Sequence, residues 1–206
     1  MIKLERTGVM NLDNALRGMR NPMSSWDKSD SYFAEDGNFV VGEADRTLAK
    51  KLVQSGTDHR KFLRQIFVSV DITAPLYWWK EYDTYKVATV ANSTSTMHKI
   101  HAKPFGREDF SCERMTPAAL ACLDQVIAVL EERRQVFVAT KDRAAWDDMI
   151  QLLPSSFHQM RTCTLNYETL LNIYYARRNH KLPEWHELCA WIEGLPEMDS
   201  FLTKEA

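Results

Sequence analysis

Apolar residues recur at every third or fourth position through most of this chain, which is typical of amphipathic helices. Over Phe67–Ile72 they alternate in part, which is typical of a strand. Ile2–Arg6 is a possible edge strand, and 154–164 can run extended into the same sheet. The helical segments are 12–19, 43–55, 75–85, 117–137, 142–153, 166–178 and 183–192. The mixture predicts an α+β (mixed α/β) fold.

Capping residues support several of these boundaries. Asn11 and Asn166 each stand where a side-chain oxygen can bond the first N–H groups of a helix. Pro75 fits a first helical position, and Thr116 followed by Pro117 forms a strong helix start.

A long polar connection, Ser24–Val41, separates the first two helices. Asp36-Gly37-Asn38 predicts a hairpin turn within it. The connection is longer than a purely structural link usually is, so it reads as a loop or lid.

Composition sets the class of protein. The chain has 206 residues, 45% hydrophobic and 26% charged, with a net charge of −2. This balance predicts one globular domain, 1–206, with no overall attraction to nucleic acid or a membrane surface. No apolar run reaches the length of about 18–20 residues that spans a bilayer. The first residues carry no signal-peptide core, so a cytoplasmic location is expected.

The cysteines and histidines give no metal signal. The 4 cysteines are widely spaced and form no CxxC pair, so buried thiols are expected rather than zinc ligands or disulfides. His98 and His101 form a close pair without a neighbouring acidic or cysteine cluster. No metal site is therefore predicted.

The richest stretch is Ala74–His101, in which an aromatic helical face is followed by small and hydroxyl residues and then by His98, Lys99 and His101. Buried hydroxyls need hydrogen-bond partners, so the run suits a turn or the wall of a polar cleft near Lys86–His98. The alternative is a loop whose hydroxyls bond only its own backbone. The aromatic residues weakly permit base stacking, although most such residues belong to a core.

Common catalytic and phosphate-binding motifs are missing. The sequence has no Walker A sequence, no GxGxxG, no GxSxG and no HExxH. Pattern alone thus predicts a mixed domain with a polar cleft and leaves its ligand open.

The order of several segments resembles the flavin-dependent thymidylate synthases, the ThyX family, over roughly residues 12–195. His59 precedes the predicted strand and Ala74-Pro75, as a histidine does in the family. The family signature RHRxxSxNExSxRY is replaced by TYKVATVANSTSTMH, in which Asn92 and Ser95 match and Lys86 can stand for the last arginine of RHR.

The segment closer to the C-terminus matches without gaps. The family has Leu-Pro, then Thr-x-Asn, then a helix with Leu-Arg. This chain has Leu153-Pro154, Thr164-Leu165-Asn166, Leu170 and Ala176-Arg177 at those places.

The resemblance implies a central, mostly antiparallel sheet flanked by helices, in a homotetramer that holds FAD and deoxyuridylate (dUMP) between subunits. NADPH would supply electrons and methylenetetrahydrofolate the methyl group. By position, the implied flavin-binding residues are His59, Lys61, Lys86, Asn92, Tyr175, Arg177 and Lys181. The implied nucleotide-binding residues are Glu81, Ser93, Ser95 and His98, with Ser95 the candidate catalytic residue that orients or polarises the base.

The chain departs from the family at several charged positions. Arg-His-Arg is Thr84-Tyr85-Lys86, the signature glutamate is Ser93, and its later arginine is Met97. The family's nucleotide-binding arginine after Thr-x-Asn is Glu168, which would repel a phosphate, and no arginine lies around Trp185–Glu187. Arginine and lysine normally hold a nucleotide phosphate, so these losses bear on activity more than on fold.

Three hypotheses follow from this sequence. The chain is a flavin-dependent methylase of a pyrimidine nucleotide, a nucleotide-binding or interaction protein that has kept the fold and lost the chemistry, or a related enzyme that acts on a different nucleotide or small ligand. Substitute anion contacts in the first case would come from Lys86, His98, Lys99, Arg161, Arg177 or Arg178.

Overall fold

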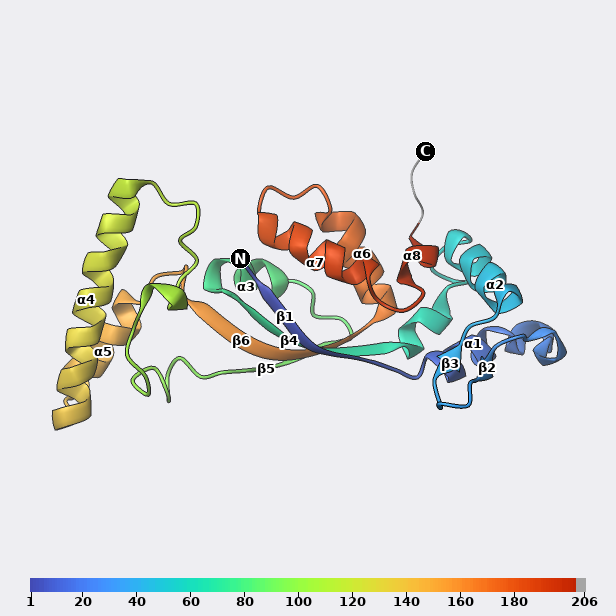
Figure 1. Cartoon of the computed structure of the whole chain (residues 1–206), viewed down its shortest axis with the longest axis horizontal. Coiled ribbons are helices and arrows are strands. Elements are labelled where there is room, and N and C mark those ends of the chain that lie inside the picture. Colours follow the sequence, from blue (N-terminus) through green and yellow to red (C-terminus); the bar gives the residue numbers. More distant parts are fainter. Residues whose placement is uncertain (203–206) are drawn as a thin grey trace. The chain divides into compact units, whose positions relative to one another are not determined.

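A sheet of four antiparallel strands, in the order β1-β4-β6-β5, is the central element of the computed structural model, which describes residues 1–202 (Figure 1). β1 and β5 form its edges, so the prediction of an edge strand at the N-terminus is confirmed. The mixed α+β class is also confirmed. The strands are β1 (Lys3–Met10), β4 (Phe67–Pro75), β5 (Thr89–Ser93) and β6 (His158–Asn166).

The chain divides into two compact units. Unit 1 consists of Met1–Lys3, Asp71–Thr84 and Ala91–Thr162, and unit 2 of Leu4–Val70, Tyr85–Val90 and the residues from Cys163 onward. Each of the four strands contributes residues to both units. The single domain 1–206 stays a prediction, and its last four residues lie outside the described part.

The buried residues of unit 1 include a cluster between α4 and α5 and the aromatic face of α3. α4 and α5 lie side by side and enclose Leu123, Leu130 and Met149, which are at most 5% exposed (Figure 1). In α3, Trp78 and Trp79 are almost fully buried against each other and against Tyr82, so this aromatic face is core. The helices of this unit are α3 (Leu76–Tyr82), η4 (Arg107–Asp109), α4 (Pro117–Thr140) and α5 (Arg143–Leu152).

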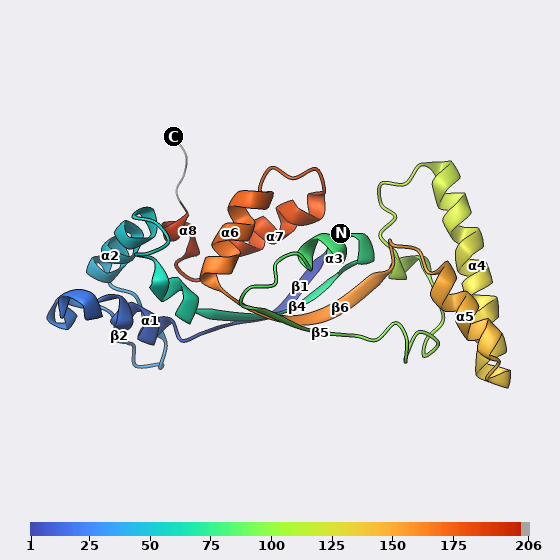
Figure 2. The ribbon, with the colours of Figure 1, turned by 180° about the vertical axis from the view of Figure 1, so that it is seen from behind.

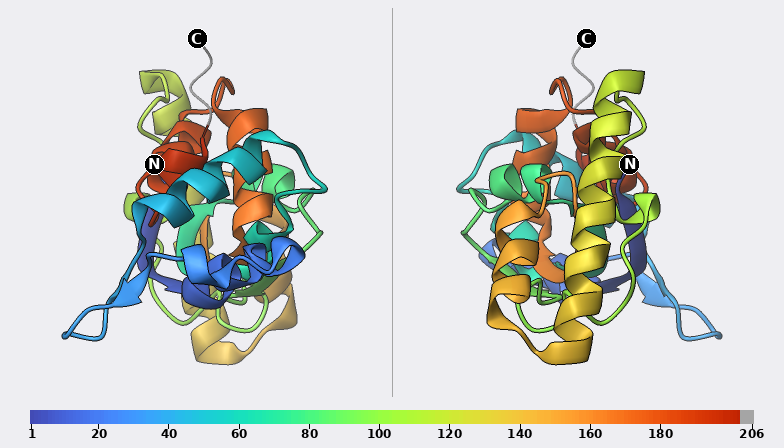
Figure 3. Two further views of the ribbon diagram at one scale, coloured as in Figure 1. Left: turned by 90° about the vertical axis from the view of Figure 1, so that its right-hand side faces the viewer. Right: turned by 90° about the vertical axis from the view of Figure 1, so that its left-hand side faces the viewer.

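Unit 2 packs its helices in pairs. α6 and α7 lie against each other (Figure 2), and α6 also contacts η3. The hairpin of β2 and β3 pairs Tyr32 with Val40, and its turn projects away from the helices of its unit (Figure 3). Its turn contains Gly37 at a φ of 83°, as Asp36-Gly37-Asn38 predicted. The elements are α1 (Leu12–Met19), η1 (Asn21–Met23), η2 (Trp26–Lys28), β2 (Tyr32–Phe33), β3 (Phe39–Val40), α2 (Glu43–Gln54), η3 (Lys61–Gln65), α6 (Tyr167–Arg177), α7 (Pro183–Glu193) and α8 (Met198–Phe201).

Two of the three predicted caps form, and the predicted helix start at Pro75 does not. Thr116 accepts a hydrogen bond from the N–H of Ala119, and Asn166 accepts one from Thr169 at 2.9 Å. Asn11 instead has a positive φ of 69°, and its amide donates to the carbonyl of Gln65. Pro75 is the last residue of β4 rather than the first of a helix, because its φ of −69° suits extended backbone equally well.

Other differences from the sequence prediction are local. The helix predicted over 75–85 ends at Tyr82, which leaves Tyr85 outside it. The hydroxyl-rich run contains the unpredicted strand β5, and α8 was not predicted either. The four cysteines are free thiols, but only Cys163 and Cys189 are buried as expected, whereas Cys122 is exposed and Cys112 is half-buried. Burial raises the pKa of Cys189 to about 11. None of the helices within residues 1–202 has both the length and the apolar character needed to cross a membrane.

Candidate functional site

The predicted flavin-binding residues, apart from Asn92, all lie in unit 2. Tyr175 and Arg177 lie on the last turn of α6, and Lys181 follows that helix. Lys61 opens η3, which packs against α6, and His59 precedes it. Lys86 lies in the short segment 85–90. Helix α6 is thus the element around which these residues are arranged.

Arg177 is held on an aromatic surface. Its Nε donates a hydrogen bond of 2.8 Å to the hydroxyl of Tyr85. Its guanidinium lies 4.6 Å from the centre of the Trp185 ring and 5.5 Å from that of Tyr85. Both contacts are favourable for a cation. Arg177 therefore ties the segment that carries Lys86 to α6 and α7.

A second contact fixes the same segment. The hydroxyl of Thr169, on the first turn of α6, donates to the carbonyl of Val87 at 3.3 Å. Lys86 lies between this contact and that of Tyr85, and its side chain is exposed. The backbone on both sides of Lys86 is therefore positioned by α6 while its ammonium stays accessible.

The negative charge of Glu168 is compensated by neighbouring arginines. It is 9% exposed and accepts hydrogen bonds from Arg60, at 3.2 Å, and from Arg64. Burial raises the pKa of its carboxyl, but the two arginines outweigh this and hold the pKa below its usual value. With two arginines and one carboxylate, this cluster carries a net positive charge. The expectation that Glu168 would repel a phosphate is therefore weakened by neighbours that the sequence alone did not reveal.

The side chains of the flavin candidates in unit 2 match the chemical groups of FAD. FAD carries a doubly charged pyrophosphate, which requires cations, and a planar ring system, which suits aromatic neighbours. The side chains of Lys61, Lys86 and Lys181 are exposed, and in the described part of the chain none pairs with a carboxylate. His59 is exposed as well, and Tyr175 is half-buried.

The predicted nucleotide-binding residues all lie in unit 1. Ser93 ends β5, next to the flavin candidate Asn92, and both are exposed. Ser95 lies in the turn after β5, where its Oγ accepts hydrogen bonds from the N–H groups of Met97, at 3.2 Å, and His98, at 2.9 Å. The oxygen of Ser95 thus accepts hydrogen bonds from its own backbone, as the alternative interpretation predicted. Its O–H can still donate to another acceptor. The remaining candidate, Glu81, is half-buried on α3.

Ser95 also lines a cavity of about 950 Å³ within unit 1. Hydroxyls from Thr73, Thr94 and Thr96 lie around it with the cations Lys3, Lys99, Lys103 and Arg107. Lys103 pairs with Asp109, and Arg107 pairs with Asp124. Within the stretch Lys86–His98, where a polar cleft was expected, only residues 94–96 line this cavity. Ser93, His98 and Glu81 do not line it.

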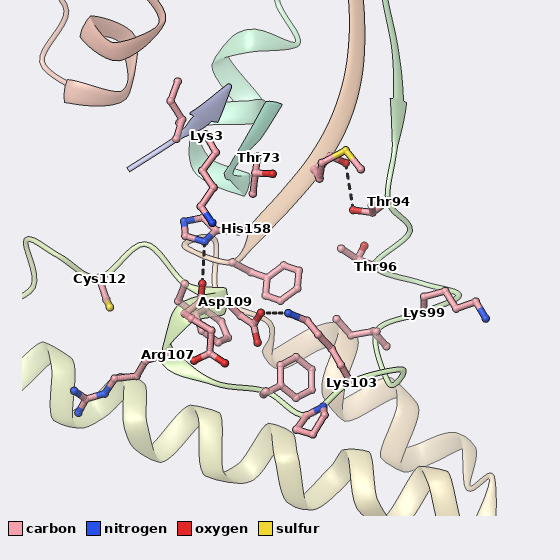
Figure 4. A pocket seen from close by; sticks show the side chains of 18 of the residues that line it. Lys3, Thr73, Thr94, Thr96, Lys99, Lys103, Arg107, Asp109, Cys112 and His158 are labelled. Carbon is pink, nitrogen blue, oxygen red and sulfur yellow. Dashed lines mark hydrogen bonds and ion pairs between the residues drawn. The ribbon is translucent and has the colours of Figure 1, made fainter. Parts of the chain in front are cut away.

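His158 adds a titratable group to this cavity (Figure 4). Its Nδ1 lies 3.4 Å from the carbonyl oxygen of Glu108, and its Nε2 is buried without a hydrogen-bond partner in the described part of the chain. Burial lowers the pKa of its imidazole, so the ring is neutral at neutral pH. A donor N–H at Nδ1 leaves Nε2 as a hydrogen-bond acceptor.

Sequence reasoning missed the partners of the predicted residues. Tyr85 and Trp185 lie in the segments 75–85 and 183–192, which were predicted only as helices, yet both contact Arg177. Arg60 and Arg64 carried a helical i, i+4 spacing that could have marked them, but nothing indicated Glu168 as their counterion. Lys3, Lys103 and His158 are far apart in sequence, and only the fold brings them to one cavity.

Comparison with known proteins shows which solved structures share the fold of this chain. No protein-family model matches the chain, and no curated protein matches it. A crystal structure of thymidylate synthase X (ThyX) from Helicobacter pylori with FAD and dUMP has a TM-score of 0.73 and 15% identity, covering 98% of this chain and 96% of that one. A UMP/dUMP methylase, PolB from Streptomyces cacaoi bound with 5-Br dUMP, has a TM-score of 0.65 and 13% identity, covering 98% and 94%. This chain therefore has the fold of the ThyX flavin-dependent thymidylate synthases, in a highly divergent sequence.

Proposed function

We propose that this protein binds FAD and methylates a deoxyuridylate-type pyrimidine nucleotide. The observation that carries the proposal is the clustering of the flavin candidates on and around α6 in unit 2, in a chain whose fold matches a ThyX with FAD and dUMP over 98% of its length. Bound FAD would supply the redox chemistry, with NADPH as electron source and methylenetetrahydrofolate as carbon source.

The residues of this chain would bind and orient. Lys61, Lys86 and Lys181 offer accessible positive charge to a pyrophosphate, and Arg177 keeps the Lys86 segment in place. Ser95 would orient or polarise the pyrimidine through its O–H, since its acceptor capacity is already used by the backbone. Glu81, Ser93 and His98 are the further contacts proposed for the nucleotide, and Asn92 for the flavin.

The missing signature arginines favour a second candidate. A ThyX-fold protein that has lost this activity and serves as a nucleotide-binding or interaction protein would also keep the fold. Met97 in place of an arginine and Glu168 in place of another are the observations that favour it, because each removes a charge-assisted contact to phosphate. The two arginines around Glu168 restore only part of that charge.

The visible absorption spectrum tests the proposal. Purified protein is mixed with FAD and desalted, and the retained flavin is measured. Retention near one FAD per chain supports the flavoenzyme, and formation of thymidylate from deoxyuridylate, NADPH and methylenetetrahydrofolate would then establish the activity. A colourless protein that releases all FAD contradicts the proposal and leaves the second candidate.

The assembly and location are proposed on the same basis. A homotetramer and a cytoplasmic location would match the ThyX family. Light scattering in solution tests the tetramer, and a mass equal to one chain of 23.9 kDa would contradict it.

A further inference from the structure

The long connection Ser24–Val41 is anchored at its polar positions. Asp45, which is 1% exposed, accepts hydrogen bonds from the hydroxyls of Ser29 and Ser31, each at 2.6 Å. Arg20, 4% exposed, donates to the same carboxylate at 2.5 Å. Asp30 accepts hydrogen bonds from the first N–H groups of α2. The connection is therefore anchored at Ser29–Ser31 to Arg20 and to the start of α2.

Its aromatic residues nevertheless face solvent. Trp26, Tyr32 and Phe33 are 52%, 58% and 62% exposed, although burial of such side chains is strongly favourable. All three line a cavity of about 550 Å³ inside unit 2, a volume within the usual range for small-molecule sites. Exposed aromatic rings around a cavity mark a binding surface.

The same cavity is lined by a carboxylate and a guanidinium on α1. Asp13 and Arg17 are one helical turn apart, a spacing at which such side chains usually pair, yet no ion pair joins them. Asn14 lies between the two. Its amide nitrogen donates to Asp13 at 3.2 Å, and its amide oxygen accepts from Arg17 at 3.1 Å. A carboxylate acceptor and a guanidinium donor, bridged by Asn14, therefore line one cavity, each with capacity for a ligand.

We propose that this cavity is a binding site for a guanine-type base. Trp26, Tyr32 or Phe33 would stack on the ring, Asp13 would accept from two N–H groups on its edge, and Arg17 would donate to the adjacent carbonyl oxygen.

The polar pair favours guanine over other bases. Guanine presents N1–H and an amino group beside one carbonyl oxygen, which match a carboxylate next to a guanidinium. Adenine offers one amino group and no carbonyl, so it would leave Arg17 unsatisfied. Uracil has a single ring N–H between two carbonyls, so Asp13 would meet an oxygen.

This site is independent of the proposed methylase function. Its residues are not among the candidates for flavin or deoxyuridylate. Loss of FAD binding in an Arg177 variant would therefore leave the guanine site intact, and the two proposals fail separately.

Titration with guanosine tests the inference. Saturation-transfer NMR and calorimetry are carried out on the full chain, with adenosine and uridine as comparisons. We expect saturable guanosine binding with a Kd below about 1 mM, and binding of the other nucleosides weaker by about tenfold or more.

Matched variants locate the binding. Trp26→Ala and Asp13→Asn should each weaken guanosine binding by about tenfold or more. Met23→Ala and Asp27→Asn alter exposed residues of the same region that do not line the cavity, and they should have no effect.

Three results would overturn the inference. The first is the absence of saturable guanosine binding, and the second is an equal loss of guanosine affinity in the control variants. The third is a change of oligomeric state in Trp26→Ala, measured as the mass in solution, when the parent protein binds no guanosine. The last result would show that a second copy of the chain covers the aromatic surface instead.

Discussion

The carboxylate of Glu168 lies 3.2 Å from Nε of Arg60, and Arg64 contacts its other oxygen. The ThyX family has a nucleotide-binding arginine at this position, so a negative charge there looked incompatible with a phosphate. Both arginines come from the segment around η3, which packs on α6. At the position where the resemblance places that arginine, this chain therefore has a glutamate held by two arginines.

Removing this carboxylate should destabilise the fold. Glu168→Gln leaves Arg60, whose side chain is 17% exposed, beside a neutral amide. Loss of a charged hydrogen-bond partner costs about 1–3 kcal/mol. Urea denaturation should show a free energy of unfolding lower by that amount. Glu132→Gln, on an exposed pair with Arg133, is the control and should change stability by less than about 0.5 kcal/mol.

The same carboxylate should make stability depend on pH. The folded pKa of Glu168 is lowered, so its contribution is present above the ordinary value of 4.5 and is lost as the pH falls through the folded pKa. Unfolding experiments between about pH 6 and 3 should show the advantage of the parent over Glu168→Gln shrinking as the pH falls. An advantage that stays constant over this range would contradict the ion-pair assignment.

Arg177 should affect both flavin affinity and stability. Arg177→Ala removes the hydrogen bond to Tyr85 and the contact with Trp185, so we expect unfolding free energy to fall by about 1–2 kcal/mol. Under the proposed function, FAD affinity should fall by about tenfold or more, as measured by titration under native conditions.

A second variant separates these effects. Tyr85→Phe removes only the hydroxyl that accepts a hydrogen bond from Nε of Arg177, and it keeps the aromatic ring. It should reproduce part of the stability loss with a smaller effect on FAD. If Arg177→Ala lowers stability while FAD binding is unchanged or absent in both proteins, Arg177 has a structural role alone.

Ser95 should matter more for the nucleotide than for folding. Ser95→Ala removes an acceptor for two backbone N–H groups in an exposed turn, which should cost about 1 kcal/mol. Deoxyuridylate affinity, measured by calorimetry with FAD present, should fall by about tenfold if the O–H contacts the pyrimidine. Ser55→Ala, which removes an exposed hydroxyl bonded to its own helix, is the matched control. Unchanged deoxyuridylate affinity in Ser95→Ala would contradict the role of Ser95.

Much of the secondary structure was predictable because it depends on local chemistry. Thr116 and Asn166 cap their helices as the sequence indicates, since a side-chain oxygen next to the first free N–H groups finds them within three residues. The prediction that Pro75 begins a helix was wrong because helical and extended backbone share its fixed φ. The strand β5 was missed because its stability depends on pairing with β6, which is distant in sequence.

The candidate site was only partly predictable. The resemblance selected Lys61, Lys86 and Arg177 by position, and the fold places them all in one compact unit. It gave no indication that Arg177 rests on Tyr85 and Trp185, or that Ser95 already bonds its own backbone.

The sequence by itself determined the mixed α+β class, the course of most helices and the order of segments that resembles ThyX, because periodicity, caps and turns act over a few residues. Only the tertiary structure decided how charges are compensated. Glu168 meets Arg60 and Arg64, and Asp45 meets Arg20, across separations that no local pattern encodes. The free energy of a charge depends on its neighbours in space, and those are set by packing of the whole chain.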